Sequence, residues 1–277
     1  MNEEIIDNII SLALKEDIPH GDITSESVIP LNSVSGAVIV AKEDCILSGL
    51  GIAEKVFKTI DDSVQFKPFF KDGQSVKKND QIASLSGRSI SLLKGERTAL
   101  NFIQRMSGIA TKTNRFVKAL EGTKTKILDT RKTTPGLRVL EKYAVKMGGG
   151  ENHRLNLSSM VIIKDNHIQI TGSISDSVQK AKEKMKKDMK IEVEARNFEE
   201  VKEAINSGVD MVMLDNMGIK DIKKVVQCFG NKVLFEVSGN VDLEDIKNLA
   251  STGVDFISVG ALTHSYKSID LSMEIIR

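Results

Sequence analysis

The sequence lacks tryptophan and has little of several other features that mark particular classes of protein. Aromatic residues make up only 4% of the 277 residues, and proline occurs four times. Because 40% of the residues are hydrophobic, a chain of this length can still bury a large, mainly aliphatic core in one or two domains. The composition therefore excludes a disordered, collagen-like or disulfide-stapled protein.

Cysteine is scarce as well, since Cys45 and Cys228 are the only two and lie far apart in the sequence. A secreted protein of this size held by disulfides would carry more, so we expect reduced, mostly buried thiols in a cytoplasmic protein. No apolar run reaches the ~18 residues that a transmembrane helix needs. Residues 1–4 are acidic, unlike the basic start of a signal peptide, so we expect no membrane association.

An excess of charge of one sign is also absent. The 39 Lys and Arg balance 38 Asp and Glu, for a net charge of +1. A protein that binds nucleic acid or a membrane surface by general electrostatic attraction would show an excess of basic residues. We therefore expect neither nucleic acid nor membrane as a partner, while local charged sites remain open.

The first part of the chain has a mixed helix and strand texture. Apolar residues keep helical spacing over residues 3–15, and short β-like runs separated by turns follow over 34–93. Helical spacing returns from Gly95 to about residue 120. We interpret this helix as the link between a first domain, residues 1–112, and a second, residues 113–277.

The second part alternates strands and helices. Six runs are strand-like, many of them β-branched or fully apolar, as parallel strands covered by helices are: 126–129, 159–163, 190–194, 210–214, 232–236 and 255–259. Helical stretches separate the later runs: 174–187, 197–207, 219–228 and 242–251. Glu194 and Asp215 are 21 residues apart, as are Asp215 and Glu236, which fits one strand, one helix and two loops. The pattern predicts a β/α barrel with six strands rather than eight, and therefore an incomplete one.

Active sites of β/α barrels lie at the C-terminal ends of the strands. Every predicted strand end carries polar residues or glycine: Asp129, Thr130, Arg131, Lys132, Lys164, Asp165, Asn166, His167, Glu194, Asp215, Asn216, Ser238, Gly239, Asn240, Gly260 and Ala261. A polar strand end can simply face solvent, but six such ends together indicate a common pocket.

The side chains at these ends divide by charge. The early ends bring the cations Arg131, Lys132 and Lys164, and the later ends bring Glu194 and Asp215. Two carboxylates combined with substrate phosphates are a usual Mg²⁺ site, and they can also stabilise a developing oxocarbenium-like cation. Both properties indicate sugar-phosphate chemistry.

The last two strand ends differ from the others, because they form glycine-containing turns. Ser238–Gly239–Asn240 follows the fifth predicted strand, and Gly260 follows the sixth. Backbone N–H groups of turns at these places often hold phosphate in barrels. The pocket is therefore expected to bind an anionic substrate with at least one phosphate.

Several motifs, in this order along the chain, resemble those of the quinolinate phosphoribosyltransferases, also called carboxylating nicotinate-nucleotide pyrophosphorylases. They are KED at 15–17, HGD at 20–22, GER at 95–97, TRKTTPG at 130–136, NHR at 152–154, KDNH at 164–167, IEVE at 191–194, LDN at 214–216 and EVSGN at 236–240. The pair TRKTTPG and KDNH, about 30 residues apart, is highly specific.

The resemblance implies a fold and a reaction. The fold is an N-terminal α/β sandwich domain, residues 1–112, followed by an incomplete α/β barrel domain, residues 113–277, whose last helix is able to pack back on the first domain. The reaction is Mg²⁺-dependent transfer from phosphoribosyl pyrophosphate to quinolinate, which yields nicotinate mononucleotide, pyrophosphate and CO₂ for NAD biosynthesis. The resemblance also implies a homodimer, with a higher oligomer left open.

For quinolinate, the resemblance implies that Arg131, His153 and Arg154 bind the two carboxylates. Arg97 would reach into the neighbouring subunit's site for the same purpose. Planar guanidinium groups suit rigid carboxylates, so the residue types agree with these roles.

For phosphoribosyl pyrophosphate, the resemblance implies a second set of contacts. Lys132, Glu194 and Asp215 would be catalytic, and the two carboxylates would sit near the ribose and hold the metal directly or through water. The remaining contacts with the substrate anions would come from Lys132, Lys164, Ser238, Gly239, Asn240 and Gly260.

Three alternatives stay open from the sequence. A barrel with lysines at strand ends could be a Schiff-base lyase, although these lysines sit among arginines and acidic residues. A relative of the same fold could act on another aromatic acid or be associated with molybdate transport. Residues 34–93 loosely resemble a lipoyl-carrier domain, which would need a modified lysine at a hairpin tip.

Overall fold

The computed structural model describes residues 3–276, so residues 1–2 of the predicted first domain and residue 277 of the second lie outside the described residues. The chain forms two compact units. Unit 1 comprises the residues up to 114, together with 133–149 and the residues from 263 on. Unit 2 comprises 115–132 and 150–262.

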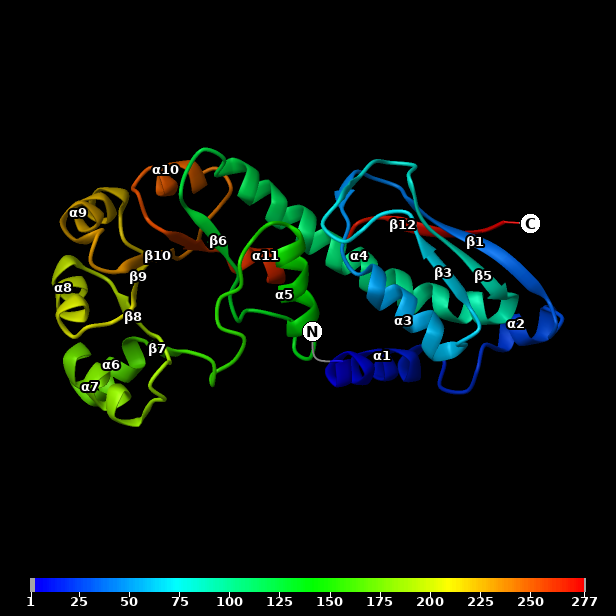
Figure 1. Ribbon diagram of the computed structural model, residues 1–277, viewed down its shortest axis with the longest axis horizontal. Coiled ribbons are helices and arrows are strands. Elements are labelled where there is room, and N and C mark those ends of the chain that lie inside the picture. Colours follow the sequence, from blue (N-terminus) through cyan, green and yellow to red (C-terminus); the bar gives the residue numbers. More distant parts are fainter. Residues whose placement is uncertain (1–2, 277) are drawn as a thin grey trace. The chain divides into compact units, whose positions relative to one another are not determined.

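Unit 1 is built on an antiparallel sheet (Figure 1). Its four strands have the order β12–β1–β5–β3: β12 (Leu271–Ile276), β1 (Val34–Ala41), β5 (Gln81–Arg88) and β3 (Gln65–Pro68). β2 (Cys45–Ile46) and β4 (Ser75–Val76) form a separate pair. The helices are α1 (Glu3–Asp17), α2 (Ile23–Val28), α3 (Leu50–Ile60), α5 (Arg138–Met147) and most of α4 (Ser89–Ala119). The mixed helix and antiparallel sheet confirm the predicted α/β character of the N-terminal region.

The core of unit 1 explains its helices. The middle of α4 is largely buried, including Leu100, Ile103 and Met106, and residues 106–110 are buried without a break. This part of the helix therefore lies in the core and is enclosed on several sides. α3 is capped at Gly49, whose N–H donates to Asp72 Oδ2 at 3.0 Å, while the N–H of Leu50 donates to Asp72 Oδ1 at 3.1 Å. An aspartate in a later turn therefore caps this helix. The sequence analysis overlooked α3, although its buried residues Ala53, Val56 and Phe57 keep helical spacing.

The end of the chain corrects one expectation. The last described element is the strand β12 rather than a helix, and it pairs antiparallel with β1 from Leu271 opposite Ala41 to Ile276 opposite Gly36. Leu271 and Met273 are buried while the intervening Ser272 is not, which is the period of two that a strand requires. The prediction of a last helix packing on the first domain was therefore wrong about the element type.

Unit 2 is a six-stranded parallel sheet flanked by helices. The strands are β6 (Lys126–Leu128), β7 (Val161–Ile163), β8 (Ile191–Ala195), β9 (Met211–Asp215), β10 (Leu234–Ser238) and β11 (Phe256–Ser258). The helices are α6 (Asp165–Thr171), α7 (Ile174–Lys184), α8 (Phe198–Asn206), α9 (Ile219–Phe229), α10 (Ile246–Ala250) and the start of α11 (Ala261–His264).

The order of these strands is β6–β11–β10–β9–β8–β7. Strands adjacent in the chain are neighbours in the sheet except at β6 and β7, which form no ladder with each other within residues 3–276. The sheet thus follows a barrel with one opening, and the predicted incomplete, six-stranded barrel is confirmed. Almost every residue of β8 and β9 is buried, because helices cover a parallel sheet on its outer face.

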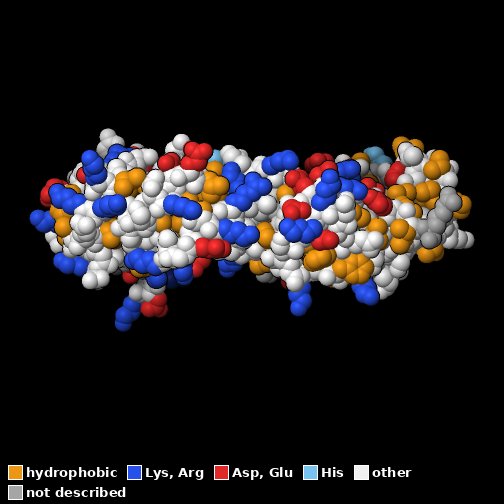
Figure 2. All heavy atoms as spheres, turned by 90° about the horizontal axis from the view of Figure 1, so that it is seen from above, with side chains coloured by type: hydrophobic (Ala, Val, Ile, Leu, Met, Phe, Trp, Pro, Cys, Tyr) orange, Lys and Arg blue, Asp and Glu red, His pale blue; other side chains and the backbone are white. Residues whose placement is uncertain are grey.

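The surface and the cysteines complete the comparison with the composition. Figure 2 shows Lys and Arg interspersed with Asp and Glu over the visible face, as the net charge of +1 suggests.

Cys45 is buried, and burial raises the pKa of its thiol to about 12. Cys228 is exposed, so the expectation of mostly buried thiols holds for Cys45 alone. Over residues 3–276, no helix combines the length and apolar character that a membrane crossing needs.

Candidate active site

The two predicted catalytic carboxylates lie at neighbouring strand ends of unit 2. Glu194 is the fourth residue of β8, and its Oε2 lies 2.8 Å from Nζ of Lys164, which directly follows β7. Asp215 is the last residue of β9, beside Ser238 of β10 in the sheet register. Both carboxylates are partly exposed, at 11% and 19%. The parallel sheet therefore places these two carboxylates at the same edge as Ser238, which was predicted to contact a phosphate.

The turn after Ser238 needs glycine. Gly239 has φ of +151°, and a Cβ at this position would lie 2.7 Å from Oδ1 of Asn216. Asn216 itself has φ of +52°, and its backbone N–H donates to the carbonyl oxygen of Ser238 at 3.1 Å. A backbone hydrogen bond therefore links the turns after β9 and β10. Gly239, where the sequence predicted phosphate binding, has no side chain to cover its backbone.

A buried aspartate holds the segment that bears two of the predicted quinolinate contacts, His153 and Arg154. Asp129, which is fully buried, accepts the N–H of His153 at 2.8 Å and the side-chain amide of Asn152 at 2.9 Å. Arg154 donates from NH1 to the carbonyl of Met160 at 3.0 Å. Burial and then the positive charge of Arg131 lower the pKa of Arg154 from its ordinary value. The two arginines thus lie close enough to repel each other, an arrangement that a dianionic ligand would relieve.

A buried carboxylate pair accompanies His153, and the sequence analysis assigned it no role. Glu192 and Glu236 are both 0% exposed. Nε2 of His153 lies 2.9 Å from Glu192 Oε2 and 3.1 Å from Glu236 Oε2. The available signal was a glutamate inside each of two otherwise apolar strand runs, IEVEA and LFEVS, where a charged side chain is rarely buried without a purpose.

The environment shifts the proton affinity of both partners. Burial and then the charge of Glu236 raise the pKa of Glu192 to about 7. Burial lowers the pKa of His153, but its hydrogen bond to Glu192 and its contact with the carboxylate of Glu236 outweigh burial and raise the pKa to about 10. These three side chains also satisfy a geometric test for metal ligands, since their donor atoms lie within 4.8 Å of one another.

A further cation that the sequence analysis missed lies beside Asp215. NH2 of Arg196 is 2.6 Å from Asp165 Oδ2, and Nε of Arg196 is 3.9 Å from Asp215 Oδ2. Arg196 immediately follows β8, so its position one residue beyond a strand end was the available signal. His167 acts locally, because its Nδ1 accepts the backbone N–H of Lys164 at 2.9 Å and caps α6.

The remaining predicted site residues lie in different places. Lys132 is exposed after β6, Asn240 is exposed after Gly239, and Gly260 follows β11. All three belong to unit 2, as do the other predicted contacts except one. Arg97 belongs to unit 1, where it is exposed on α4.

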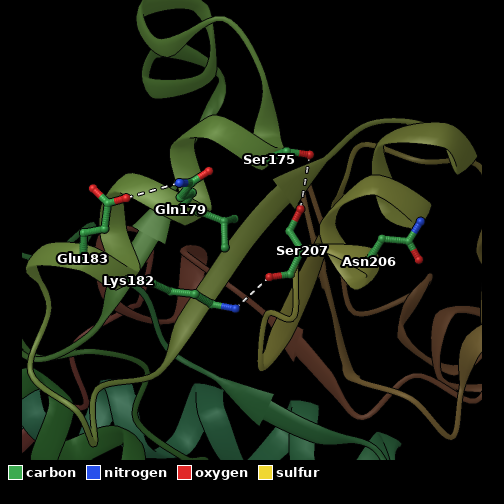
Figure 3. Close-up of a pocket in the computed structure, with 7 residues that line it drawn as sticks. Ser175, Gln179, Lys182, Glu183, Asn206 and Ser207 are labelled. Carbon is green, nitrogen blue, oxygen red and sulfur yellow. Dashed lines mark hydrogen bonds between the residues drawn. The ribbon is translucent and has the colours of Figure 1, made fainter.

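A separate hollow of unit 2 lies between α7 and α8 (Figure 3). Its polar side chains are engaged with one another: Nζ of Lys182 donates to the carbonyl of Ser207 at 2.7 Å, and Gln179 donates to Glu183 at 3.2 Å. None of the predicted site residues lines it. The strand ends are therefore the better candidate for the active site.

Known proteins resemble the chain over nearly its whole length. A protein of Synechocystis named "Probable nicotinate-nucleotide pyrophosphorylase [carboxylating]" is 44% identical and covers 99% of this chain and 93% of its own. A protein of Bacillus subtilis with the same name is 43% identical and covers 99% and 95%. The structure of the nicotinate-nucleotide pyrophosphorylase from Francisella tularensis is 43% identical, with a TM-score of 0.96, over 100% of this chain and 98% of that one.

Two family descriptions match consecutive parts of the chain. The quinolinate phosphoribosyl transferase N-terminal domain matches residues 22–107, and the C-terminal domain of the same family matches residues 109–274. The second match contains every predicted site residue except Arg97. Taken with the relatives, these matches show that the chain belongs to the quinolinate phosphoribosyl transferase family.

Proposed function

We propose that the strand ends of unit 2 transfer phosphoribose from phosphoribosyl pyrophosphate to quinolinate. The ring nitrogen replaces pyrophosphate at the ribose carbon. The carboxylate beside that nitrogen then leaves as CO₂, and the electron pair left on the ring carbon takes up a proton from water, which gives nicotinate mononucleotide. The observation that carries the proposal is the pairing of two mutually repelling arginines, Arg131 and Arg154, with two carboxylates at strand ends, Glu194 and Asp215.

Quinolinate fits the cationic side of the site. Nε of Arg154 is buried and has no hydrogen-bond partner within residues 3–276, so it is a donor available to a carboxylate. Arg131 adds a second guanidinium, and we assign the third to Arg97 of a second copy of this chain. Both ring nitrogens of His153 have protein contacts, so we place this residue at the edge of the quinolinate site.

Phosphoribosyl pyrophosphate fits the other side of the site. We assign its 5′-phosphate to the turn of Ser238, Gly239 and Asn240, with Gly260, where backbone N–H groups can approach an anion. Lys132 and Lys164 would contact the pyrophosphate. Lys164 already pairs with Glu194 and is 44% exposed, which does not suit the apolar pocket of a Schiff-base lysine.

Glu194 and Asp215 have the donor chemistry for Mg²⁺. They are hard oxygen donors, partly exposed, and they come from adjacent strands. Such a pair holds Mg²⁺ together with substrate phosphates and water, and the metal would neutralise the charge of the departing pyrophosphate. The carboxylates themselves would stabilise positive charge that develops on the ribose ring.

A homodimer is part of the proposal, because Arg97 lies in unit 1. It is exposed on α4, and Asn101 and Arg105, one and two turns further along the same face, line a hollow with residues of α1. Leu12 of α1 also lines this hollow and is 68% exposed. A single exposed leucine is ordinary on a protein surface, so the assignment of a dimer rests on the position of Arg97 in unit 1.

The proposal is tested with quinolinate that carries a label in the carboxylate next to the ring nitrogen. Protein, Mg²⁺, phosphoribosyl pyrophosphate and this substrate should release labelled CO₂ and form an equal amount of nicotinate mononucleotide. A mixture lacking phosphoribosyl pyrophosphate is the control and should release no label. Absence of CO₂ at saturating substrate concentrations would contradict the proposal.

Arg131→Ala tests the cationic side of the site. Removal of one charge-assisted contact with a carboxylate should raise the KM for quinolinate by about 10- to 100-fold. The KM for phosphoribosyl pyrophosphate should change little, and circular dichroism should show the wild-type fold. An unchanged KM for quinolinate would remove Arg131 from the site.

A further inference from the structure

Unit 2 buries more negative charge than the proposed reaction uses. Glu192 of β8 and Glu236 of β10 are 0% exposed, and within residues 3–276 neither Oε1 of Glu192 nor either carboxylate oxygen of Glu236 has a hydrogen-bond partner. Nε2 of His153 contacts both carboxylates, at 2.9 and 3.1 Å, and its side chain is 8% exposed. Burying two carboxylates beside one imidazole is costly, so this cluster needs a structural or functional reason.

The contact on the other side of the imidazole fixes its protonation. The backbone N–H of Arg154 donates to Nδ1 of His153 at 2.8 Å. A nitrogen that accepts a hydrogen bond carries no proton, so the ring proton is on Nε2 and is donated to Oε2 of Glu192. Oε2 of Glu236 lies 3.1 Å from the same nitrogen without accepting a hydrogen bond, so Glu236 acts on the ring by its charge. The raised pKa of His153 favours a second proton, but that proton would force the Nδ1–H against the Arg154 N–H.

The same contact argues against a metal ion at this cluster. A metal bound to Nε2 would need the lone pair that the proton occupies. With Nδ1 accepting a hydrogen bond, such a ring would carry no proton at all, which neutral imidazole ligands do not do. His153 and Glu192 therefore form a hydrogen-bonded pair, with the carboxylate of Glu236 beside it at 3.1 Å.

This cluster controls the segment that bears Arg154. Asp129 accepts the backbone N–H of His153 on one side, and on the other side Glu192 accepts the ring N–H while the charge of Glu236 lies 3.1 Å from the same nitrogen. The Nδ1 of that ring then holds the backbone N–H of Arg154. The backbone of Arg154, from which its side chain extends, is thus fixed by hydrogen bonds to residues in the core of the sheet.

We propose that Glu192 and Glu236 are positioning residues for quinolinate, which hold His153 as the Nε2–H tautomer and thereby fix Arg154 in the binding site. They touch no substrate themselves. The inference rests on the proposed function, because it assigns Arg154 to quinolinate. The negative charge of Glu192 also offsets part of the repulsion between Arg154 and Arg131.

The first test observes the tautomer and needs no substrate. The protein is labelled with ¹⁵N-histidine, and two-bond ¹H–¹⁵N correlation spectra are recorded at pH 7.5, with His153→Gln to assign the resonance among the four histidines. We expect a neutral ring with the proton on Nε2 in the wild type. A ring protonated on Nδ1, or on both nitrogens, would overturn the proposal.

The second test measures function in Glu192→Gln and Glu236→Gln. The amide keeps the shape of the side chain, but its NH₂ group can donate to Nε2 and so weakens the tautomer preference. We expect the KM for quinolinate to rise about 10- to 100-fold, as for a misaligned hydrogen bond to a charged group, and the KM for phosphoribosyl pyrophosphate to change less than about twofold. Glu183→Gln, on the exposed face of α7, is the matched control and should behave as wild type.

The outcomes separate the two proposals. Absence of CO₂ release by the wild type would contradict the proposed function. The ¹H–¹⁵N spectra would still test whether His153 is the Nε2–H tautomer. In an active enzyme, an unchanged KM for quinolinate in both variants, or an equal rise of both KM values, overturns the positioning role. Should either variant fail to fold, the wild-type spectrum still decides whether His153 is held as the Nε2–H tautomer.

Discussion

At the residue scale, the chemistry of unit 2 depends on side chains placed two apart on one strand. Glu192 and Glu194 face the same side of β8, yet the first is fully buried against His153 and the second lies partly exposed beside Lys164. One carboxylate is therefore suited to hold a neighbour in place, and the other to contact a ligand. The sequence analysis identified Glu194 because it is the last residue of a predicted strand. It could not show that Glu192, inside the same strand, is buried against His153.

Glu194→Gln tests whether Glu194 contacts the ligand while Glu192 has a positioning role. The amide keeps a polar group at the strand end but removes the negative charge proposed to stabilise the ribose cation and hold Mg²⁺. We expect kcat to fall about 10²- to 10³-fold, as for the loss of one preorganised electrostatic contact, with the KM for quinolinate within about twofold. Steady-state kinetics with each substrate varied in turn measure the split.

A matched change makes the kinetic result specific. Glu199→Gln alters an exposed glutamate of α8 and should leave both constants at the wild-type value. If Glu194→Gln instead raised the KM for quinolinate without lowering kcat, the carboxylate would belong to substrate recognition and its catalytic assignment would fail.

At the element scale, apolar periodicity indicates most of the longer elements. The strands and the helices α7 to α9 of unit 2 follow the expected runs closely, because each strand is a short run with buried residues and each of these helices carries one apolar face. α6 was not predicted, since none of its residues is buried, and α3 was overlooked although its buried residues keep helical spacing. β12 was misjudged because its strand character depends on pairing with β1, more than 200 residues earlier.

Asp61 joins three elements of unit 1 and makes its stability depend on pH. The carboxylate follows α3 and accepts hydrogen bonds from Nε of Arg88 at 2.7 Å, the hydroxyl of Ser91 at 2.8 Å and the hydroxyl of Ser63 at 2.6 Å. These bonds, led by the one from Arg88, hold the pKa of Asp61 well below its ordinary value. A depressed pKa in the folded state stabilises the protein above the unfolded pKa of about 4, and this stability is lost as the pH falls below that value.

Asp61→Asn should therefore lower the free energy of unfolding by about 1–3 kcal/mol at pH 7, through the loss of charge-assisted hydrogen bonds. The difference from wild type should shrink as the pH falls from about 4 toward 2, because the unfolded chain then binds a proton at Asp61 while the folded protein still holds the carboxylate ionised. Urea unfolding at several pH values measures both effects. Asp62→Asn, at the exposed neighbouring position, is the control, and a pH-independent difference would contradict the assignment.

At the scale of the whole molecule, the sequence predicted the class of fold better than the course of the chain through it. The six parallel strands and the N-terminal antiparallel sheet agree with the expectation. The chain, however, returns to unit 1 at residues 133–149 and again from residue 263. A local pattern cannot reveal such returns, because α5 and β12 have the periodicity of ordinary elements and only their packing assigns them to unit 1.

The division of the site residues between the units makes the proposed dimer testable by complementation. At a quinolinate concentration well below the KM of the variants, Arg97→Ala and Arg131→Ala should each have little activity alone, because either change removes one guanidinium from every site and so weakens quinolinate binding. If Arg97 acts in the partner's site, a mixed dimer of the two variants contains one site with both changes and one site with neither. Half of the dimers are mixed when equal amounts of the two variants exchange subunits, so activity should return to about a quarter of the wild-type value.

Subunit exchange and activity are followed together in this experiment. The two variants, carrying different affinity tags, are mixed and sampled until tandem purification shows that mixed dimers have formed. A quarter of the wild-type activity in the mixture, and about half in the purified mixed dimers, is the expected result. A mixture of Arg154→Ala with Arg131→Ala is the control and should stay inactive, because both changes are proposed to act on the site of their own chain. Mixed dimers of Arg97→Ala and Arg131→Ala that gain no activity would instead place Arg97 in the site of its own subunit.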